Sequence, residues 1–367
     1  MAKSKSQTGN DRGLVNVLLA RFSAFGDVAM TIPVVYSACR CYPDVHFVMV
    51  TRPAMTGMFV EAPDNLTVIG ADIHDRYRGV RGISRLVQEL CARWRFDAFI
   101  DLHDVLRTRL MGLLCRLRGI PVKRLNKGRA RKRALTRRRN KVMLPLISQR
   151  ARYREAFFKA GLPLTDRFDG LFGGRGKADP GLFARITPPK RRGERWVGIA
   201  PFAAHAGKIY PIDRMERVVE ALATRPDTRI FLFGGAGDEA ETLNGWAAKH
   251  PQTVTCLAGK KYGFGAELAL LNHIDVMVSM DSANMHLASI AGAPTVSVWG
   301  ATHPYCGFKG WRQADTDMVQ LPMTCRPCSV FGQKPCYRGD YLCLRAIKPE
   351  TILAKVTEKL GTEPENG

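Results

Sequence analysis

The residues best suited to chemistry lie in two short turns, each of which follows an apolar run. In the turn within residues 279–304, Ser282 and Ala283 stand between such a run and a helical segment. A helix start has unpaired backbone N–H groups and the positive end of the helix dipole, and both favour a bound phosphate. The other turn places Asp27 just after the apolar run 14–20. A carboxylate there either caps the helix or faces a ligand.

Alternating apolar runs and amphipathic segments must position these turns. Short β-branched runs predict strands at 14–20, 45–50, 66–69, 96–102, 196–201, 229–233, 254–259, 274–279 and 295–299. Helices are predicted over 82–93, 150–160, 215–223, 268–273 and 284–290, with another running from Gly234 to Trp246. Strands that alternate with helices build parallel sheets. The sequence therefore predicts an α/β protein with two parallel-sheet domains facing one another.

Composition limits the class of protein. The 367 residues are enough for two domains, and the apolar (46%) and charged (24%) fractions are those of a globular chain. No apolar run reaches the length of a membrane span, and the first apolar run is interpreted as a strand and not as a signal peptide. We therefore expect a cytoplasmic protein. The net charge of +23 predicts an anionic partner: nucleic acid, an acidic membrane surface or a phosphorylated substrate.

A second polar group follows the predicted strand 96–102. Asp101, His103 and Asp104 stand at its carboxyl end, and Arg107 and Arg109 lie on the helix after it. Open α/β sheets bind ligands at this end of their strands. Helix capping with a surface salt bridge explains the same residues equally well.

Residues 123–141 are very basic and contain no aromatic side chain. Without aromatic residues they offer no base-stacking surface, so nucleic-acid binding is weakly supported. A loop or helix that grips phosphates or carboxylates at a membrane surface fits this composition, and so does a solvated basic face.

Two further patterns carry less specific signals. Gly234, Gly235 and Gly237 open a helix in which Glu239 is placed to bond ribose hydroxyls, although a Gly-rich turn alone is a weak signal. Near the C-terminus, Cys325, Cys328, Cys336 and Cys343 form the one local concentration of thiols. Only the first pair has CxxC spacing, so a zinc site competes with simple packing or redox chemistry.

The chain as a whole resembles the lipopolysaccharide heptosyltransferases of glycosyltransferase family 9. The resemblance extends over 14–347 and rests on four features. They are Arg21-Phe22-Ser23-Ala24-Phe25-Gly26-Asp27-Val28 followed by Pro33, Lys208 before Tyr210-Pro211, Met280-Asp281-Ser282-Ala283-x-x-His286 continuing to Pro304, and the C-terminal cysteines. The chain departs from the family where Tyr210 replaces the usual Trp before Pro, and where Ala283 replaces a frequent Gly.

The resemblance implies a GT-B fold, in which two Rossmann-like domains with parallel sheets enclose the active site. It implies inverting, metal-independent transfer of heptose from an ADP-heptose donor to a lipopolysaccharide-core acceptor, with no cofactor. Asp27 would be the general base and Lys208 the cation that neutralises the leaving diphosphate. It further implies donor contacts from Asp281, Ser282, Ala283, His286, Glu239 and Gly259, and acceptor contacts from Ser23, Gly26, Asp101, His103, Arg107, Arg129 and Arg131.

On this basis we expect a disordered tail at 1–13, an acceptor-side domain at 14–175, a linker at 176–193, a donor domain at 194–346 and a C-terminal helix and tail at 347–367. The expected partners are a nucleotide-sugar donor and an acidic glycolipid acceptor. The protein would contact the anionic cytoplasmic face of the inner membrane peripherally and bind no specific nucleic acid. The alternatives are a GT-B enzyme that uses another nucleotide sugar and a basic nucleic-acid-binding protein.

Overall fold

The computed structural model describes residues 14–361, so the predicted tail at 1–13 and residues 362–367 lie outside it. The described strands form two sheets, one of five strands and one of six, in which all neighbouring strands run parallel. The first has the order β3-β2-β1-β4-β5, with β1 (Asn16–Ala20), β2 (His46–Thr51), β3 (Leu66–Gly70), β4 (Ala98–Asp101) and β5 (Val122–Arg124). The second has the order β11-β10-β9-β6-β7-β8, with β6 (Arg195–Ala200), β7 (Thr228–Leu232), β8 (Val254–Cys256), β9 (Val276–Met280), β10 (Thr295–Trp299) and β11 (Met318–Gln320).

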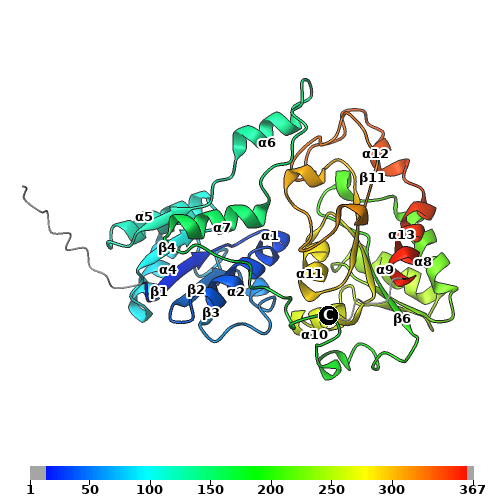
Figure 1. Cartoon of the computed structure of the whole chain (residues 1–367), viewed down its shortest axis with the longest axis horizontal. Coiled ribbons are helices and arrows are strands. Elements are labelled where there is room, and N and C mark those ends of the chain that lie inside the picture. Colours follow the sequence, from blue (N-terminus) through cyan, green and yellow to red (C-terminus); the bar gives the residue numbers. More distant parts are fainter. Residues whose placement is uncertain (1–13, 362–367) are drawn as a thin grey trace, which may run out of the picture.

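Helices connect the strands and cover both faces of each sheet (Figure 1). The first half holds α1 (Phe25–Ala29), α2 (Ile32–Cys41), α3 (Pro53–Thr56), α4 (Gly79–Arg93), α5 (Leu106–Arg116), α6 (Arg129–Thr136) and α7 (Gln149–Lys159). The second half holds α8 (Ile212–Ala223), α9 (Asp238–Lys249), α10 (Phe264–His273), α11 (Ala283–Ala291), α12 (Leu342–Arg345) and α13 (Pro349–Gly361). Short 3-10 turns lie at Pro180–Phe183, Ala206–Lys208, Pro304–Cys306 and Asp315–Asp317.

The side-chain alternation of β1 explains the layers. Val17 and Leu19 point into the core that α2 and α7 cover, whereas Leu18 and Ala20 point into the core under α4 and α5. The first of these cores continues into the second half beneath α10 and α11, and a third core lies under α8, α9 and α13. A parallel sheet buried on both faces accounts for the nearly continuous apolar strands of the sequence.

The predicted strands and helices are confirmed, with shifts of a few residues at their ends. Two strands were not predicted, β5 and β11, each of three residues at a sheet edge. They are too short to show an apolar period. None of the helices within 14–361 is both long and apolar enough to cross a lipid bilayer.

The chain passes from one half to the other near residue 170. Asp169 still pairs with Arg40 of α2 at 2.7 Å, whereas the backbone N–H of Leu171 already donates to the carbonyl oxygen of Ile290 in α11 at 3.0 Å. Gly176 and Ala178, in the predicted linker, both bond Asn272 of α10 at 2.9 Å. We therefore propose that the boundary between the domains lies ahead of 176–193.

Candidate active site

The two turns singled out in the sequence meet in space. A Cβ atom on Gly26 would lie 2.9 Å from Cδ2 of His286 and 3.4 Å from Cα of Ala283. Only a glycine allows α1 to approach α11 this closely. Both helices follow central strands, β1 and β9, at their carboxyl ends. The α1–α11 junction therefore joins the loop edges of the two sheets.

Asp27 lies in the first turn of α1 and is held by Arg21. The Nη2 atom of Arg21 lies 2.8 Å from Oδ2 of Asp27, and the backbone N–H of Ala24 donates to the same oxygen at 3.4 Å. The second oxygen, Oδ1, accepts no hydrogen bond from the described residues. The carboxylate therefore caps its helix and pairs with Arg21 through one oxygen, and the other oxygen stays available to a ligand.

Lys208 and Asp281 form an ion pair beside the start of α11. The Lys208 Nζ atom lies 3.2 Å from Oδ2 of Asp281, and the hydroxyl of Thr302 donates to that oxygen at 2.7 Å. Both charged side chains are largely buried. The pair fixes the ammonium group at the edge from which α11 presents its free N–H groups.

The start of α11 has the form expected of an anion site. Its N-cap residue, Ser282, has extended backbone and makes no side-chain capping bond to the helix. The first-turn N–H groups are therefore uncapped by that side chain. His286, on the same helix, is buried, and its Nδ1 atom has no hydrogen-bond partner among residues 14–361. Burial, with Arg150 and Lys208 nearby, lowers the pKa of His286 to about 3, so its ring is neutral at physiological pH.

The other two expected donor residues make local contacts. Oε2 of Glu239 accepts a hydrogen bond from the backbone N–H of Gly235 at 2.6 Å, so this carboxylate orders the Gly-rich turn after β7. Gly259 follows β8 with a φ of +73°, where a side chain is strained, and it lies against Ala240 of α9. Their donor roles stay predictions.

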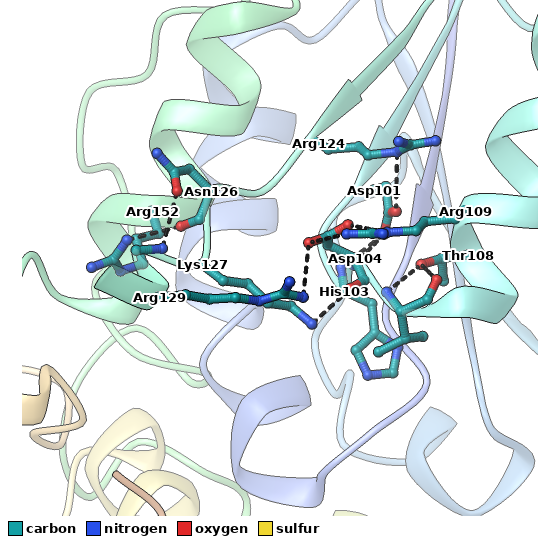
Figure 2. Close-up of polar contacts among 12 residues, drawn as sticks. Asp101, His103, Asp104, Thr108, Arg109, Arg124, Asn126, Lys127, Arg129 and Arg152 are labelled. Atoms are coloured by element: carbon teal, nitrogen blue, oxygen red, sulfur yellow. Dashed lines mark hydrogen bonds and ion pairs between the residues drawn. The ribbon is translucent and has the colours of Figure 1, made fainter. Parts of the chain in front are cut away.

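The polar residues after β4, some of which are expected to contact the acceptor, form one connected cluster (Figure 2). Oδ1 of buried Asp101 accepts from the backbone N–H groups of His103 and Asp104 at 2.9 and 2.8 Å. Arg109 bonds both carboxylate oxygens of Asp104, at 2.8 and 3.3 Å, and Lys127 donates to the Asp104 carbonyl oxygen at 2.7 Å. Burial acts to raise the pKa of Asp104, but Arg109, Lys127 and Arg129 together outweigh burial and the pKa is lowered.

His103 links this cluster to the Asp27 turn. Its Nδ1 atom accepts from the backbone N–H of Phe22 at 3.4 Å, so Nε2 carries the hydrogen and faces the Ser23 hydroxyl at 3.3 Å. Burial, together with four nearby cations, lowers its pKa to about 3; the cations are Arg21, Lys127, Arg107 and Arg52. The site next to Ser23 is therefore electropositive and suits an anionic ligand.

The buried neutral ring of His103 predicts acid sensitivity. A free histidine has a pKa of 6.5, so between pH 6.5 and about 3 the unfolded chain binds a proton that the folded chain excludes. Stability therefore falls as the pH drops through this window, by about 2 kcal/mol at pH 5 for this one residue. We expect His103→Gln to remove that share of the pH dependence in thermal melts between pH 7 and 5. The exposed control His74→Gln should retain it, and equal slopes for wild type and His103→Gln would contradict the assignment.

The basic segment lies mainly against the second half of the chain, which the sequence did not predict. Residues 128–149, here called the strap, include α6 and run from the first sheet to the loops after β10 (Figure 1). Lys132 Nζ lies 5.3 and 5.5 Å from the rings of Phe308 and Phe331. Lys141 donates to the carbonyl oxygens of Cys325 and Pro327 at 2.5 and 2.7 Å. The strap therefore ties the two sheets together beside the α1–α11 junction.

Two expected acceptor residues at the start of the strap are exposed. Arg129 approaches Asp104 at 3.9 Å with most of its side chain in solvent, and Arg131 is also exposed. Lys132, on the same helix, is instead half-buried, and burial lowers its pKa to about 8 while Asp27 acts to raise it. Acceptor contacts of Arg129 and Arg131 stay predictions.

Loosening the strap should expose it to trypsin. Lys141→Ala removes two hydrogen bonds from a charged donor, and such bonds each contribute roughly 1.5–3 kcal/mol. We therefore expect cleavage within the strap to become at least about tenfold faster. Lys123→Ala, at an exposed lysine before the strap, is the matched control. An unchanged cleavage rate in Lys141→Ala would mean that this contact does not hold the strap down.

The four C-terminal cysteines are free thiols, and the loop of the first two contacts the strap. The Sγ atom of Cys328 lies 3.5 Å from the carbonyl oxygen of Cys325, in the same loop that receives Lys141. Within 14–361, no group of three or more His, Cys, Asp or Glu side chains has the arrangement of a metal site. The zinc site that the sequence suggested at Cys325, Cys328, Cys336 and Cys343 stays a hypothesis, and the geometry of the described residues does not support it.

Sequence reasoning missed some residues at this site. Arg21 was quoted in a motif without a role of its own, yet it holds Asp27. Arg52 contributes to the positive field at His103. Glu267, in the first turn of α10, has a pKa raised to about 7 by burial. Its neighbour Phe264 stacks 6.3 Å from Phe25 across the domains. The sequence could have indicated Arg21, because an arginine stands six residues before the Asp27 carboxylate. It contained no pattern that would have indicated Glu267.

Two facing Rossmann-like sheets, with a helix start and a lysine on one and a carboxylate on the other, define a GT-B glycosyltransferase. The chain belongs to glycosyltransferase family 9 (heptosyltransferase), which it matches over residues 83–335.

Named relatives agree with this family. The chain is 28% identical over 88 residues to lipooligosaccharide heptosyltransferase 2 of Campylobacter jejuni, a match covering 24% of this chain and 26% of that protein. It is 22% identical over 303 residues to lipopolysaccharide heptosyltransferase 3 of Escherichia coli K12, covering 81% and 84%. The structure of E. coli heptosyltransferase WaaC with ADP superposes with a TM-score of 0.65 at 18% identity, covering 94% and 100%. These relatives support a heptosyltransferase function in lipopolysaccharide core biosynthesis.

Proposed function

We propose that this chain transfers heptose from ADP-heptose to an acidic lipopolysaccharide-core acceptor, such as Kdo-lipid A or an inner-core sugar, with inversion at the anomeric carbon. The observation that carries the proposal is the α1–α11 junction, where Gly26 brings Asp27 beside the helix that starts at Ser282. In a single displacement the acceptor and the leaving group lie on opposite faces of the sugar, and a base and an anion site on different domains can serve these two faces.

In the proposed step, Oδ1 of Asp27 takes the proton of the acceptor hydroxyl as its oxygen attacks the anomeric carbon. The bond between that carbon and the β-phosphate oxygen breaks, and its electron pair leaves with ADP. Lys208 and the free N–H groups of α11 stabilise the charge that develops on ADP. Since these groups supply the positive charge, the step needs neither a metal nor a cofactor.

The positive field around His103 supports an acidic acceptor. Arg21, Arg52, Arg107 and Lys127 all act on this ring, next to Ser23 and the Asp27 turn. An acceptor carboxylate or phosphate would be attracted there without contacting the donor site. This arrangement is consistent with work at the cytoplasmic face of the inner membrane, on an acceptor that is part of a glycolipid.

Nucleotide binding separates this function from its alternatives. We expect ADP to raise the melting temperature more than UDP or GDP, since a ligand at a hundred times its Kd adds about 2.7 kcal/mol of stability. A larger shift with UDP or GDP would favour a GT-B enzyme with another donor. No shift with any of the three, together with salt-sensitive binding of RNA or DNA, would favour the nucleic-acid-binding alternative. The contacts of Lys132 and Lys141 with the second domain count against that alternative.

A further inference from the structure

Helix α5 carries large apolar side chains on its outer surface. Leu106, Leu113 and Leu117 are 86%, 51% and 74% exposed, and Leu110 lies between them and is half-buried. Their spacing places all four on one face of the helix. The opposite face, with Met111 and Cys115, is already buried against the sheet. Helix α5 therefore has two apolar faces, one packed against the sheet and one, formed by the leucines, exposed to solvent.

The leucines border an apolar groove between α4 and α5. Its volume is about 660 Å³, and its apolar lining is supplied by Val80, Ile83, Val105, Leu106, Leu110 and Leu113. Val80 is 68% exposed. Contiguous exposed apolar surface of this kind marks an interaction site more often than a free surface.

Arginines surround this apolar surface. Arg78 and Arg81 stand at the start of α4, Arg107 and Arg109 line the groove, and Arg116 and Arg118 follow at the end of α5. No acidic residue occurs in α5. The one in α4, Glu89, is engaged by Arg76 at 2.7 Å. The surface therefore combines exposed leucines with a ring of positive charge.

We propose that this surface, the α4–α5 face (Val80, Leu106, Leu113 and Leu117 with the surrounding arginines), docks onto an anionic lipid bilayer. The leucines would enter the acyl boundary and the arginines would meet the lipid phosphates, as in interfacial amphipathic helices. A second copy of the chain fits less well, because a symmetric contact would set arginines against arginines. Nucleic acid fits less well because its phosphate backbone provides no apolar surface against which the leucines can be buried.

The position of the α4–α5 face on the molecule is compatible with binding to a bilayer. It begins at Leu106, the first residue of α5, and nearby Arg109 both lines the groove and holds Asp104 in the cluster of Figure 2. In Figure 1, α5 is on the outer side of the first domain, remote from the second domain. A bilayer could therefore contact the α4–α5 face next to the electropositive site without separating the two sheets. The proposal does not depend on the reaction, because binding is measured without substrates.

The test is cosedimentation of the full chain with vesicles of phosphatidylethanolamine and phosphatidylglycerol, compared with phosphatidylcholine alone. We expect preferential binding to the anionic vesicles that weakens with salt. The triple variant Leu106→Gln/Leu113→Gln/Leu117→Gln should bind about tenfold more weakly or worse. Its melting temperature should hold, because the replaced side chains are exposed. The control Phe158→Gln/Leu182→Gln changes apolar residues of similar exposure (67% and 48%) on other elements and should bind as wild type does.

Three results would overturn the proposal. One is wild-type binding that is absent or equal on both kinds of vesicle. Another is a triple variant that binds as wild type does. The last is light scattering that shows a lipid-free dimer which the triple variant converts to monomer, since that result assigns the face to a second copy.

Discussion

We expect Asp27→Asn to lower kcat by about a hundredfold to ten-thousandfold, the range that a positioned general base contributes. The asparagine cannot take the acceptor proton at Oδ1, although it retains the size of the aspartate. Affinity for ADP should stay near wild type, because Asp27 lies across the α1–α11 junction from Lys208 and Asp281. Steady-state kinetics with a fixed acceptor, together with calorimetric ADP binding, measure both quantities.

The control for this variant is Asp64→Asn, an exposed aspartate of the same domain. It should leave both kcat and ADP affinity unchanged. If Asp27→Asn turns over normally, Asp27 is a helix cap and a partner of Arg21, as its Oδ2 contacts alone would suggest. If ADP affinity falls together with kcat, the variant has disturbed α11, and the base assignment loses its support.

Lys208→Ala should have the second large effect. Removing the ammonium group takes away positive charge where ADP departs, and we expect kcat to fall by about 10²–10³-fold with weaker ADP binding. The change also leaves Asp281 buried without its cation, which costs roughly 3 kcal/mol of stability. Kinetics, ADP titration and thermal melts each report one of these consequences.

The double variant Lys208→Ala/Asp281→Asn separates catalysis from stability. It removes both charges of the pair, so the melting temperature should recover, but ADP binding and turnover should not. Lys261→Ala, at an exposed lysine of the same domain, is the matched control. Recovery of turnover in the double variant would show that Lys208 only balances Asp281.

The sequence predicted the two sheets and the turns at their edges because both depend on local patterns. A buried parallel strand is a short apolar run, and the turn after it carries small and polar residues, as around Asp27 and Ser282. Such patterns give the strand ends to within a few residues. They do not say that Gly26 approaches His286, because that contact depends on how the domains pack.

The strap shows most clearly what local patterns cannot predict. Its lysines and arginines have the same composition whether they face solvent, lipid or the other domain. Only the fold reveals that Lys132 lies over Phe308 and that Lys141 bonds the cysteine-rich loop. The leucines of α5 present the opposite case, because an apolar helical period normally indicates core, yet Leu106 and Leu117 are exposed.

The central claim is tested most directly by NMR of the anomeric proton of the product formed from ADP-heptose and a purified lipopolysaccharide-core acceptor. The account predicts a heptosyl product whose anomeric configuration is opposite to that of the donor. A product that retains the donor configuration, or no heptosyl product from ADP-heptose while another nucleotide sugar is used, would contradict it.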